Sequence, residues 1–599
     1  MALALWMSGA VFAQDKAPDI AKLTEQLRAS DAPTRRTAAY RLAQLGPQAK
    51  DALPALIKAL DDSDKQVWSS AVGAIAEFGP AAAAAIPALI DGLDSRKARG
   101  SNPRGRNQVV MRSAHALAQI GAAAIPPLMQ ALGGDDTPLR IGAAKALGGM
   151  GPAAKEAIPA LLTNFGHEDG ELRREVIEAL AAMGVEAKPE IIEALSWNEP
   201  LQRGTAALAH AQHGKAAGDA APALTDRLSK ETDPMVRASL LTALVKVGVE
   251  PATLAPLLID GLKDDREPIR RAAINGLLTV RPASARPTLI AMLRDPATSE
   301  RAAYVLGRLG DKEAVAAIVE AAMKQQPPSA AFGDALAQIG EASVPEILRA
   351  VEKENPDALT STHWSVKCLS AMGGLAVPSL ARGVASPSLS VRLVAARALS
   401  TLGPDAEIAA PELFKALADP DARVRAQSLA ALAAAKTDAK TLVPRIEAAL
   451  KDASADVRLA GLAAWGGVER DAAQKIPPLA AALDDPDDRV RRAAAAGLAA
   501  LGEKAADTAP KFLPMLRRDS ERGFALEALR QLKVRAVPAL VEMLGVPDAA
   551  VQVFACERLA SLGAAARDAI PALQALPPDA PENVRTAAQR ALEKIGPAN

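Results

Sequence analysis

Residues 388–425 read SLSVRLVAARALSTLGPDAEIAAPELFKALADPDARVR, and this stretch decides the fold. From Val391 to Leu402, apolar side chains recur at three- and four-residue spacing, which is the pattern of one face of an α-helix. Gly403-Pro404 ends that helix, because glycine accepts a left-handed C-cap and proline blocks continuation. A second helix follows with Pro411 in its first turn, where a missing N–H costs nothing. Each helix is too short to persist alone in water, so neighbouring helices must bury its apolar face.

This helix pair recurs along the chain, and three kinds of marker share a period of 33 residues. The markers are a proline, a Val-Arg pair and a glycine, as in Pro345/Pro378/Pro411/Pro444/Pro477/Pro510, Val391-Arg392/Val424-Arg425/Val457-Arg458/Val490-Arg491 and Gly340/Gly373. A shared period of this length is typical of a repeat array. The sequence therefore predicts an all-α fold, a right-handed α-α superhelix (a solenoid) of about seventeen helix pairs over residues 14–599. Single helices at 18–29 and 582–595 are expected to cap its two ends.

The repeat pattern Asp-Pro-Asp-x-x-Val-Arg, Ala-x-x-Ala-Leu-x-x-Leu-Gly and Ile-Pro-x-Leu resembles HEAT repeats. It is most similar to the short HEAT-like type found in bilin lyases and many bacterial proteins. In that family the arginine of the Val-Arg pair and the loop aspartates form a ladder along the solenoid. The resemblance implies an interruption at Trp68 and Gln552, which fill the arginine position without its charge. It implies a ladder formed by Arg237, Arg270, Arg392, Arg425, Arg458, Arg491 and Arg585.

Composition excludes several classes of function. The 70 basic and 70 acidic side chains give zero formal net charge, and aromatics make up 3% of the chain. Nucleic-acid binders and anionic-membrane binders need a basic field, so neither partner is expected. The two cysteines are too few for a disulfide framework or a four-thiolate zinc site.

Residues 1–13, MALALWMSGAVFA, resemble the apolar core and cleavage site of a secretory signal peptide whose charged start lies upstream. No later stretch reaches 18 consecutive apolar residues without a charge, so no integral membrane segment is expected in the mature chain. The sequence thus predicts export to the periplasm or the extracellular space.

Departures from the repeat pattern are the candidate sites. Residues 94–107, DSRKARGSNPRGRN, lengthen one loop and predict either an anion or acidic-partner contact or a solvated loop. The extensions at 324–329 and 352–357 are expected to change only the local curvature. The basic side chains of the first segment are Arg96, Lys97, Arg99, Arg104 and Arg106.

His210 and His213 occupy positions that core leucines fill in other repeats. Two imidazoles at i and i+3 share a helix face, so a metal or pH-sensitive site is one hypothesis. The alternative is a loosened repeat whose histidines bond to backbone carbonyls or water. His363 is expected to be exposed.

Two classes of function remain open. The first is a non-enzymatic scaffold that binds a protein partner on the concave face of the solenoid, which the second helices are expected to line. The second is an enzyme or enzyme accessory of the HEAT-like lyase or hydroxylase kind. Resemblance to deoxyhypusine hydroxylases would require several helical His-Glu pairs, whereas the sequence has one His-Glu pair, His167-Glu168, in an expected loop. No cofactor and no catalytic residue are therefore predicted.

We expect the exported chain to begin at Gln14. Edman sequencing or mass spectrometry of the chain from the periplasmic or extracellular fraction, expressed with its natural start codon, measures this directly. An intact N-terminus on a cytoplasmic product would contradict the predicted export.

Overall fold

The computed structural model describes residues 19–94, 103–325, 328–532 and 537–596, and these residues form helices joined by turns and loops, with no β-strand among them. They form seventeen helix pairs, α2–α3 to α34–α35, between single helices α1 and α36. The predicted all-α repeat fold and its number of pairs are confirmed. The chain divides into two compact units, Met1–Leu289 and Ile290–Asn599.

In the first unit, the single helix is α1 (Ile20–Gln26), and the remaining helices alternate between a long first helix and a shorter second helix. The first helices are α2 (Ala32–Leu45), α4 (Lys65–Glu77), α6 (Pro103–Ile120), α8 (Thr137–Met150), α10 (Gly170–Met183), α12 (Pro200–His213), α14 (Pro234–Lys246) and α16 (Glu267–Val280). The second helices are α3 (Leu53–Ala59), α5 (Ile86–Asp91), α7 (Ile125–Gly133), α9 (Ile158–Leu162), α11 (Lys188–Ala194), α13 (Ala221–Lys230), α15 (Pro251–Lys263) and α17 (Arg286–Met292), the last of which spans the boundary between the units.

The second unit continues the alternation. Its first helices are α18 (Ser299–Leu309), α20 (Ala330–Ile339), α22 (Trp364–Ala371), α24 (Leu389–Thr401), α26 (Ala422–Ala434), α28 (Ala455–Gly467), α30 (Asp488–Leu501), α32 (Asp519–Gln531), α34 (Ala549–Leu562) and the single helix α36 (Glu582–Ile595). Its second helices are α19 (Val315–Met323), α21 (Val344–Val351), α23 (Val377–Val384), α25 (Ala410–Ala416), α27 (Ala439–Ala449), α29 (Ala472–Ala481), α31 (Leu513–Leu516), α33 (Val537–Leu544) and α35 (Ile570–Gln574).

Short 3-10 segments join many of these helices, and most of them begin at the repeat glycine. Gly403 shows why glycine stands there, because its φ of +60° is a conformation that other residues adopt at a cost. The segments are η1 (Gly46–Ala52), η2 (Gly79–Ala85), η3 (Gly121–Ala124), η4 (Gly151–Ala157), η5 (Thr163–Gly166), η6 (Gly184–Ala187), η7 (Gly214–Ala220), η8 (Ala283–Ala285), η9 (Lys312–Ala314), η10 (Gly340–Ser343), η11 (Pro356–Ala358), η12 (Gly373–Ala376), η13 (Gly403–Ala409), η14 (Ala482–Asp484), η15 (Gly502–Phe512) and η16 (Gly563–Ala569).

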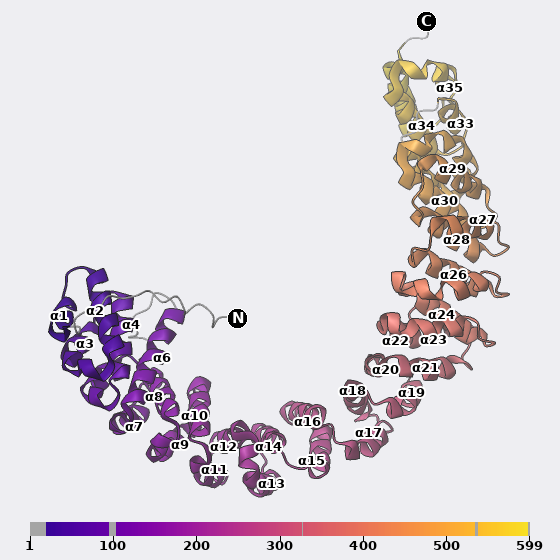
Figure 1. The fold of residues 1–599 in the computed structure, drawn as a ribbon. Coiled ribbons are helices and arrows are strands. Elements are labelled where there is room, and N and C mark those ends of the chain that lie inside the picture. The colour runs from indigo at the N-terminus through magenta and orange to yellow at the C-terminus, as the bar shows by residue number, and fades with distance from the viewer. Residues whose placement is uncertain (1–18, 95–102, 326–327, 533–536, 597–599) are drawn as a thin grey trace. The chain divides into compact units, whose positions relative to one another are not determined.

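Within each unit the helices form two layers, with first helices on one side and second helices on the other (Figure 1). In the first unit, the first helices line the inner side of the curved row. The expectation that second helices line this side is therefore wrong for the first unit. Small residues let neighbouring first helices approach closely: a Cβ added to Gly307 would lie 2.6 Å from the Cα of Ala335 in the next first helix.

Residues Asn107–Gly133 are long and apolar enough, by length and composition, to resemble a membrane span. In the structure, however, this stretch is two helices, α6 and α7, separated at Gly121, whose φ is +78°. Their apolar side chains belong to the core of the first unit, as the buried Leu117 and Leu128 show. The length of the apolar stretch thus reflects two successive core helices.

An arginine at the start of the first helix connects each of several repeats to the next, and Arg425 shows the contacts. Its Nε and Nη2 donate to the Asp452 carboxylate of the following loop at 2.9 and 2.7 Å. Its Nη1 donates backwards to the backbone carbonyls of Asp419 and Pro420 at 2.8 and 3.2 Å. Hydrogen bonds from Arg425 hold the pKa of Asp452 below its usual value.

We call this set of contacts the arginine ladder. Because Asp419 accepts from Arg392 through its carboxylate and from Arg425 through its backbone carbonyl, successive contacts join into one chain from Arg392 to Glu521. The carboxylate pairs include Arg35–Asp62, Arg203–Glu231, Arg392–Asp419, Arg425–Asp452, Arg458–Asp485 and Arg491–Glu521.

Three expected members of the ladder make fewer contacts. Arg237 donates to two backbone carbonyls, but its buried Nε has no partner. Arg270 bonds to the carbonyls of Asp264 and Asp265, and Arg585 bonds to that of Pro578.

The two positions without the arginine charge are filled differently. The partly buried Trp68 packs against Val109 and Val110 of the next first helix. Gln552 donates to the carbonyl of Leu544 at 3.1 Å.

We expect Asp452→Asn to destabilise the repeats around α26 and α28 by about 1–3 kcal/mol, because it removes the charge from a partly buried pair that makes several hydrogen bonds. Hydrogen–deuterium exchange of the full chain should show faster exchange in these helices than in distant repeats. The control is Asp456→Asn, since the Asp456–Arg489 pair is half exposed and should matter little. Equal exchange in the two variants would contradict a stabilising ladder.

Candidate functional site

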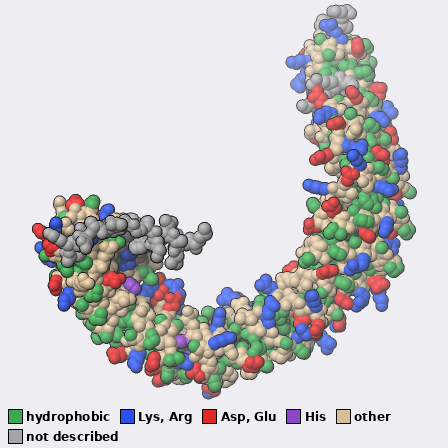
Figure 2. Space-filling model, viewed as in Figure 1, with side chains coloured by type: hydrophobic (Ala, Val, Ile, Leu, Met, Phe, Trp, Pro, Cys, Tyr) green, Lys and Arg blue, Asp and Glu red, His purple; other side chains and the backbone are tan. Residues whose placement is uncertain are grey.

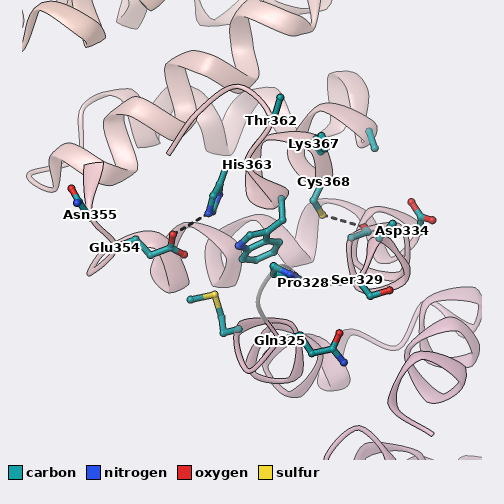
Figure 3. Close-up of a pocket in the computed structure, with 15 residues that line it drawn as sticks. Gln325, Pro328, Ser329, Asp334, Glu354, Asn355, Thr362, His363, Lys367 and Cys368 are labelled. Atoms are coloured by element: carbon teal, nitrogen blue, oxygen red, sulfur yellow. Dashed lines mark hydrogen bonds and ion pairs between the residues drawn. The ribbon is translucent and has the colours of Figure 1, made fainter. Parts of the chain in front are cut away.

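A pocket of about 770 Å³ lies on the first-helix side of the second unit, beside α20 and α22 (Figure 3). Gln325, Pro328 and Ser329 from one extended loop line it, together with Glu354 and Asn355 from another. From the sequence, these two extensions are expected to change only the local curvature. The structure corrects this: both extensions contribute to the wall of one pocket.

The pocket coincides with a change in the arginine ladder. The ladder arginine stands eleven residues before the repeat glycine, as Arg392 does before Gly403. Around the pocket, small hydroxyl side chains replace it at Ser299, Ser329 and Thr362. None of these side chains can make the forward and backward contacts of an arginine. Of the three connecting loops, residues 352–363 take the longest and most irregular path.

The centre of the pocket wall is a contact between a histidine and a glutamate. The Nε2 atom of His363 lies 3.0 Å from Oε2 of Glu354. The dashed line between these two labelled residues in Figure 3 marks this contact. The other ring nitrogen, Nδ1, accepts the Ser365 hydroxyl at 2.7 Å and the Ser365 N–H at 3.4 Å, so that His363 caps α22. Because Nδ1 is the acceptor, Nε2 carries the proton and donates it to Glu354.

Both side chains of this pair are largely enclosed, with 16% of the His363 and 19% of the Glu354 side chain exposed. The expectation of an exposed His363 is thus wrong, because the second extension folds back over it. Burial raises the pKa of Glu354. Burial, and then the charge of Arg397, lowers the pKa of His363, so this histidine is neutral at pH 7.

One oxygen of the Glu354 carboxylate lacks a hydrogen-bond donor. Its Oε1 atom is buried and has no hydrogen-bond partner among the described residues. A buried carboxylate oxygen without a donor is unfavourable by about 1–3 kcal/mol or more. The pocket therefore contains an acceptor that a bound donor would satisfy.

The second extension is fixed in place at several points. The Ser390 hydroxyl donates to the backbone carbonyl of Glu354 at 2.7 Å. The Asp357 carboxylate binds Nη1 of Arg423 at 2.5 Å, although the two residues are 66 positions apart. These contacts hold the Glu354 backbone against α24 and α26, which makes the pocket wall a defined structure.

The nucleophilic side chains near His363 are not poised to react. Ser365 is fully buried, and its hydroxyl is used in the cap of α22. Cys368 donates to the Gly333 carbonyl at 3.2 Å, and burial raises the pKa of this thiol to about 12. A protonated, buried thiol is a poor nucleophile. The arrangement is suited to binding.

The candidate histidines of the first unit have different surroundings. His210 is fully buried in α12, and neither of its ring nitrogens has a hydrogen-bond partner. Burial, and then the nearby His213, lowers the pKa of His210 to about 4. His213 is half-buried and lies 2.8 Å from the Ala209 carbonyl through Nδ1 and 3.1 Å from the Gly184 carbonyl through Nε2. Since backbone oxygens face both of its nitrogens, His213 has none free for a metal.

Across the described ranges, no group of three or more His, Cys, Asp or Glu side chains is arranged to hold a metal ion.

Part of the predicted basic loop is helical. The structure begins α6 at Pro103, which suits the first turn of a helix, so Arg104 and Arg106 lie in this helix and not in a loop. Arg96, Lys97 and Arg99 lie outside the described residues.

The comparison with known proteins agrees with the repeat architecture. The sequence matches HEAT repeats at residues 20–100, 105–181, 158–245, 255–337 and 442–533, which is more than half of the chain. The chain belongs to the HEAT-repeat family. No curated protein shows a significant sequence match to this HEAT-repeat chain.

Several solved structures are similar to this HEAT-repeat protein at low identity. The karyopherin Kap121p bound to the extreme C-terminus of the protein phosphatase Cdc14p is 13% identical, with a TM-score of 0.38, over 97% of this chain and 79% of that chain. Yeast importin-beta (Kap95p) is 12% identical, with a TM-score of 0.31, over 96% of this chain and 92% of that chain.

Sequence reasoning missed the Glu354–His363 pair because the second extension follows no repeat pattern. It also missed Arg35 and Arg203 of the ladder, which lack the preceding valine. Both stand eleven residues before a repeat glycine, Gly46 or Gly214, and this spacing was the signal that could have found them.

We expect His210→Leu to stabilise the first unit and to remove a pH dependence. The folded-state pKa of about 4 lies below the ordinary value of 6.5, so the unfolded chain binds more protons between these values. Stability should therefore fall by about 3 kcal/mol as pH drops from 6.5 to 4 in the wild type, and this loss should disappear in the variant.

Thermal melts of the full chain over this pH range measure the effect. His115→Leu, at an exposed position, is the matched control and should leave the pH dependence unchanged. A zinc-dependent rise in the wild-type melting temperature would instead support the metal hypothesis for His210 and His213.

Proposed function

We propose that this HEAT-repeat chain is a non-enzymatic, exported scaffold that binds a protein partner along the first-helix side of its solenoid. Stacked repeats present extended surfaces of this kind, on which a partner chain contacts many repeats at once. The signal-like residues 1–13 support export.

The observation that carries the proposal is the distribution of exposed large hydrophobic side chains. Ten such side chains occur among the described residues, and none of them lies on a second helix. Three of them, Tyr40, Leu208 and Tyr304, stand at the same position, six residues before the repeat glycine, and are 54%, 40% and 44% exposed. Those on first helices are Tyr40, Met111, Leu201, Leu208, Met235, Tyr304 and Phe524, and those in the connecting segments are Val185, Leu375 and Ile408.

Exposed aromatic and long aliphatic side chains on one layer favour a protein interface. The charged side chains around these exposed hydrophobic residues also favour a protein partner. Figure 2 shows basic and acidic side chains interspersed over the visible face of each unit, without a field of one sign. Such a surface suits a protein partner better than nucleic acid.

We expect a photo-crosslinking residue at Leu208 to capture a partner in the native extracytoplasmic fraction, and one at Lys230 to capture none. Leu208 lies on a first helix, whereas Lys230 ends the second helix of the same repeat and is 64% exposed. Mass spectrometry of the adducts identifies the partner. Adducts at Lys230 alone, or equal adducts at both sites, would contradict binding through the first-helix side.

The partner contact can also be weakened by mutation. The triple variant Tyr40→Ser, Leu208→Ser, Tyr304→Ser should lose at least tenfold in affinity for the crosslinked partner, because it removes three exposed apolar side chains from the proposed interface. The control triple variant, Lys58→Ser, Lys230→Ser, Glu320→Ser, changes exposed side chains of second helices and should bind normally.

A further inference from the structure

We propose that the pocket beside α20 and α22 binds an organic cation, an alkylammonium or guanidinium group, through the carboxylate of Glu354. The inference goes beyond the proposed function, because a free cation would bind whether or not the chain has a protein partner. It follows from the orphaned acceptor, the charges of the pocket and its aromatic wall.

Among the described residues, only one of the two oxygens of the Glu354 carboxylate has a hydrogen-bond donor. The Oε2 atom of Glu354 accepts from neutral His363, while Oε1 has no donor. Glu354 lines the pocket, so a ligand bound there lies beside the carboxylate whose Oε1 lacks a donor. A charged N–H donor is the strongest partner for such an oxygen, since charge-assisted bonds are about twice as strong as neutral ones.

The charges of the pocket favour a cation over an anion. The charged side chains that line it are Asp334, Glu354 and Lys367, and His363 is held neutral. Burial is the cause of the raised pKa of Glu354, and no cationic side chain offsets it. Lys367 is exposed at its position on α22. A bound cation would supply the positive charge that Glu354 lacks, and it would lower the pKa of that carboxyl.

The wall beside the pair adds a surface for an organic cation. Trp364 lines the pocket, and its ring centroid lies 5.9 Å from that of His363. An indole face attracts an ammonium or guanidinium group through the quadrupole of the ring. Alkyl carbons of the same ligand can contact Met323 and Pro328. The volume of about 770 Å³ accommodates a lysine or arginine side chain, or a small free diamine.

The test is isothermal titration of the full chain with two cationic probes. Agmatine represents a free cation, and the peptide acetyl-Gly-Ser-Arg-Ser-Gly-amide represents a partner side chain. The same peptide with citrulline in place of arginine is the neutral control. We expect saturable binding of at least one cationic probe and at least tenfold weaker binding of the citrulline peptide.

Variants connect this binding to Glu354. Glu354→Gln keeps an oxygen for His363 but places an NH₂ group where Oε1 stands, so affinity for the cation should fall at least tenfold. The control Glu352→Gln removes the same charge from an exposed position of the same extension and should bind normally. Lys367→Met removes the cation on α22 and should tighten binding about threefold, a gain that misfolding cannot produce.

The titration results distinguish a free cation from a partner side chain as the ligand, and they also show when the proposal fails. Binding of agmatine alone assigns the pocket to a free cation, and binding of the peptide alone assigns it to a side chain of a partner. Equal binding of arginine and citrulline peptides, no binding of either cationic probe, or unchanged binding by Glu354→Gln overturns the proposal. Loss of the Leu208 crosslink bears only on the scaffold proposal, since it is measured at a different site.

Discussion

The bidentate contact between an arginine at the start of one first helix and a carboxylate in the next loop organises the regular repeats. The same arginine also holds the backbone of its own loop, as Arg458 does through Nη1 to the carbonyls of Asp452 and Ala453. Each loop is therefore bonded from both sides, and its length and path are constrained. The contact also satisfies carbonyls near a helix start that would otherwise lack donors. Regular stacking depends on this arrangement together with the apolar core.

The irregular part of the second unit follows from the loss of that contact. Ser299, Ser329 and Thr362 replace the arginine there, and the loop before α22, residues 352–363, is long and bonds to other repeats. Asp357 then binds Arg423, and Ser390 holds the backbone of Glu354. New contacts thus fix the second extension over α22. A buried Glu–His pair lies in the wall of a pocket as a result.

Two buried polar groups of the first unit, Glu231 and His210, have opposite effects on stability because only one of them is hydrogen-bonded. In the ladder, Glu231 has no exposed side-chain surface, yet it accepts from Arg203 and Arg227. Burial alone would raise the pKa of Glu231, but these bonds and those from backbone N–H groups lower it to about 2. His210 has no such bonds, so its burial opposes protonation without compensation. A fully bonded buried charge stabilises the stack above the ordinary pKa of its carboxyl, whereas an unbonded histidine weakens it in acid.

The sequence by itself determined the all-helical fold, the period and the seventeen pairs, because helix starts, helix ends and apolar faces are local properties that recur every 33 residues. Tertiary structure alone decided which loop lies over which helix. Glu354 and His363 meet because a nine-residue separation is closed by a loop bonded to α24 and α26, and no periodicity encodes that path. The side of the stack formed by the first helices was likewise set by packing, since the curvature of a solenoid arises from small rotations summed over many interfaces.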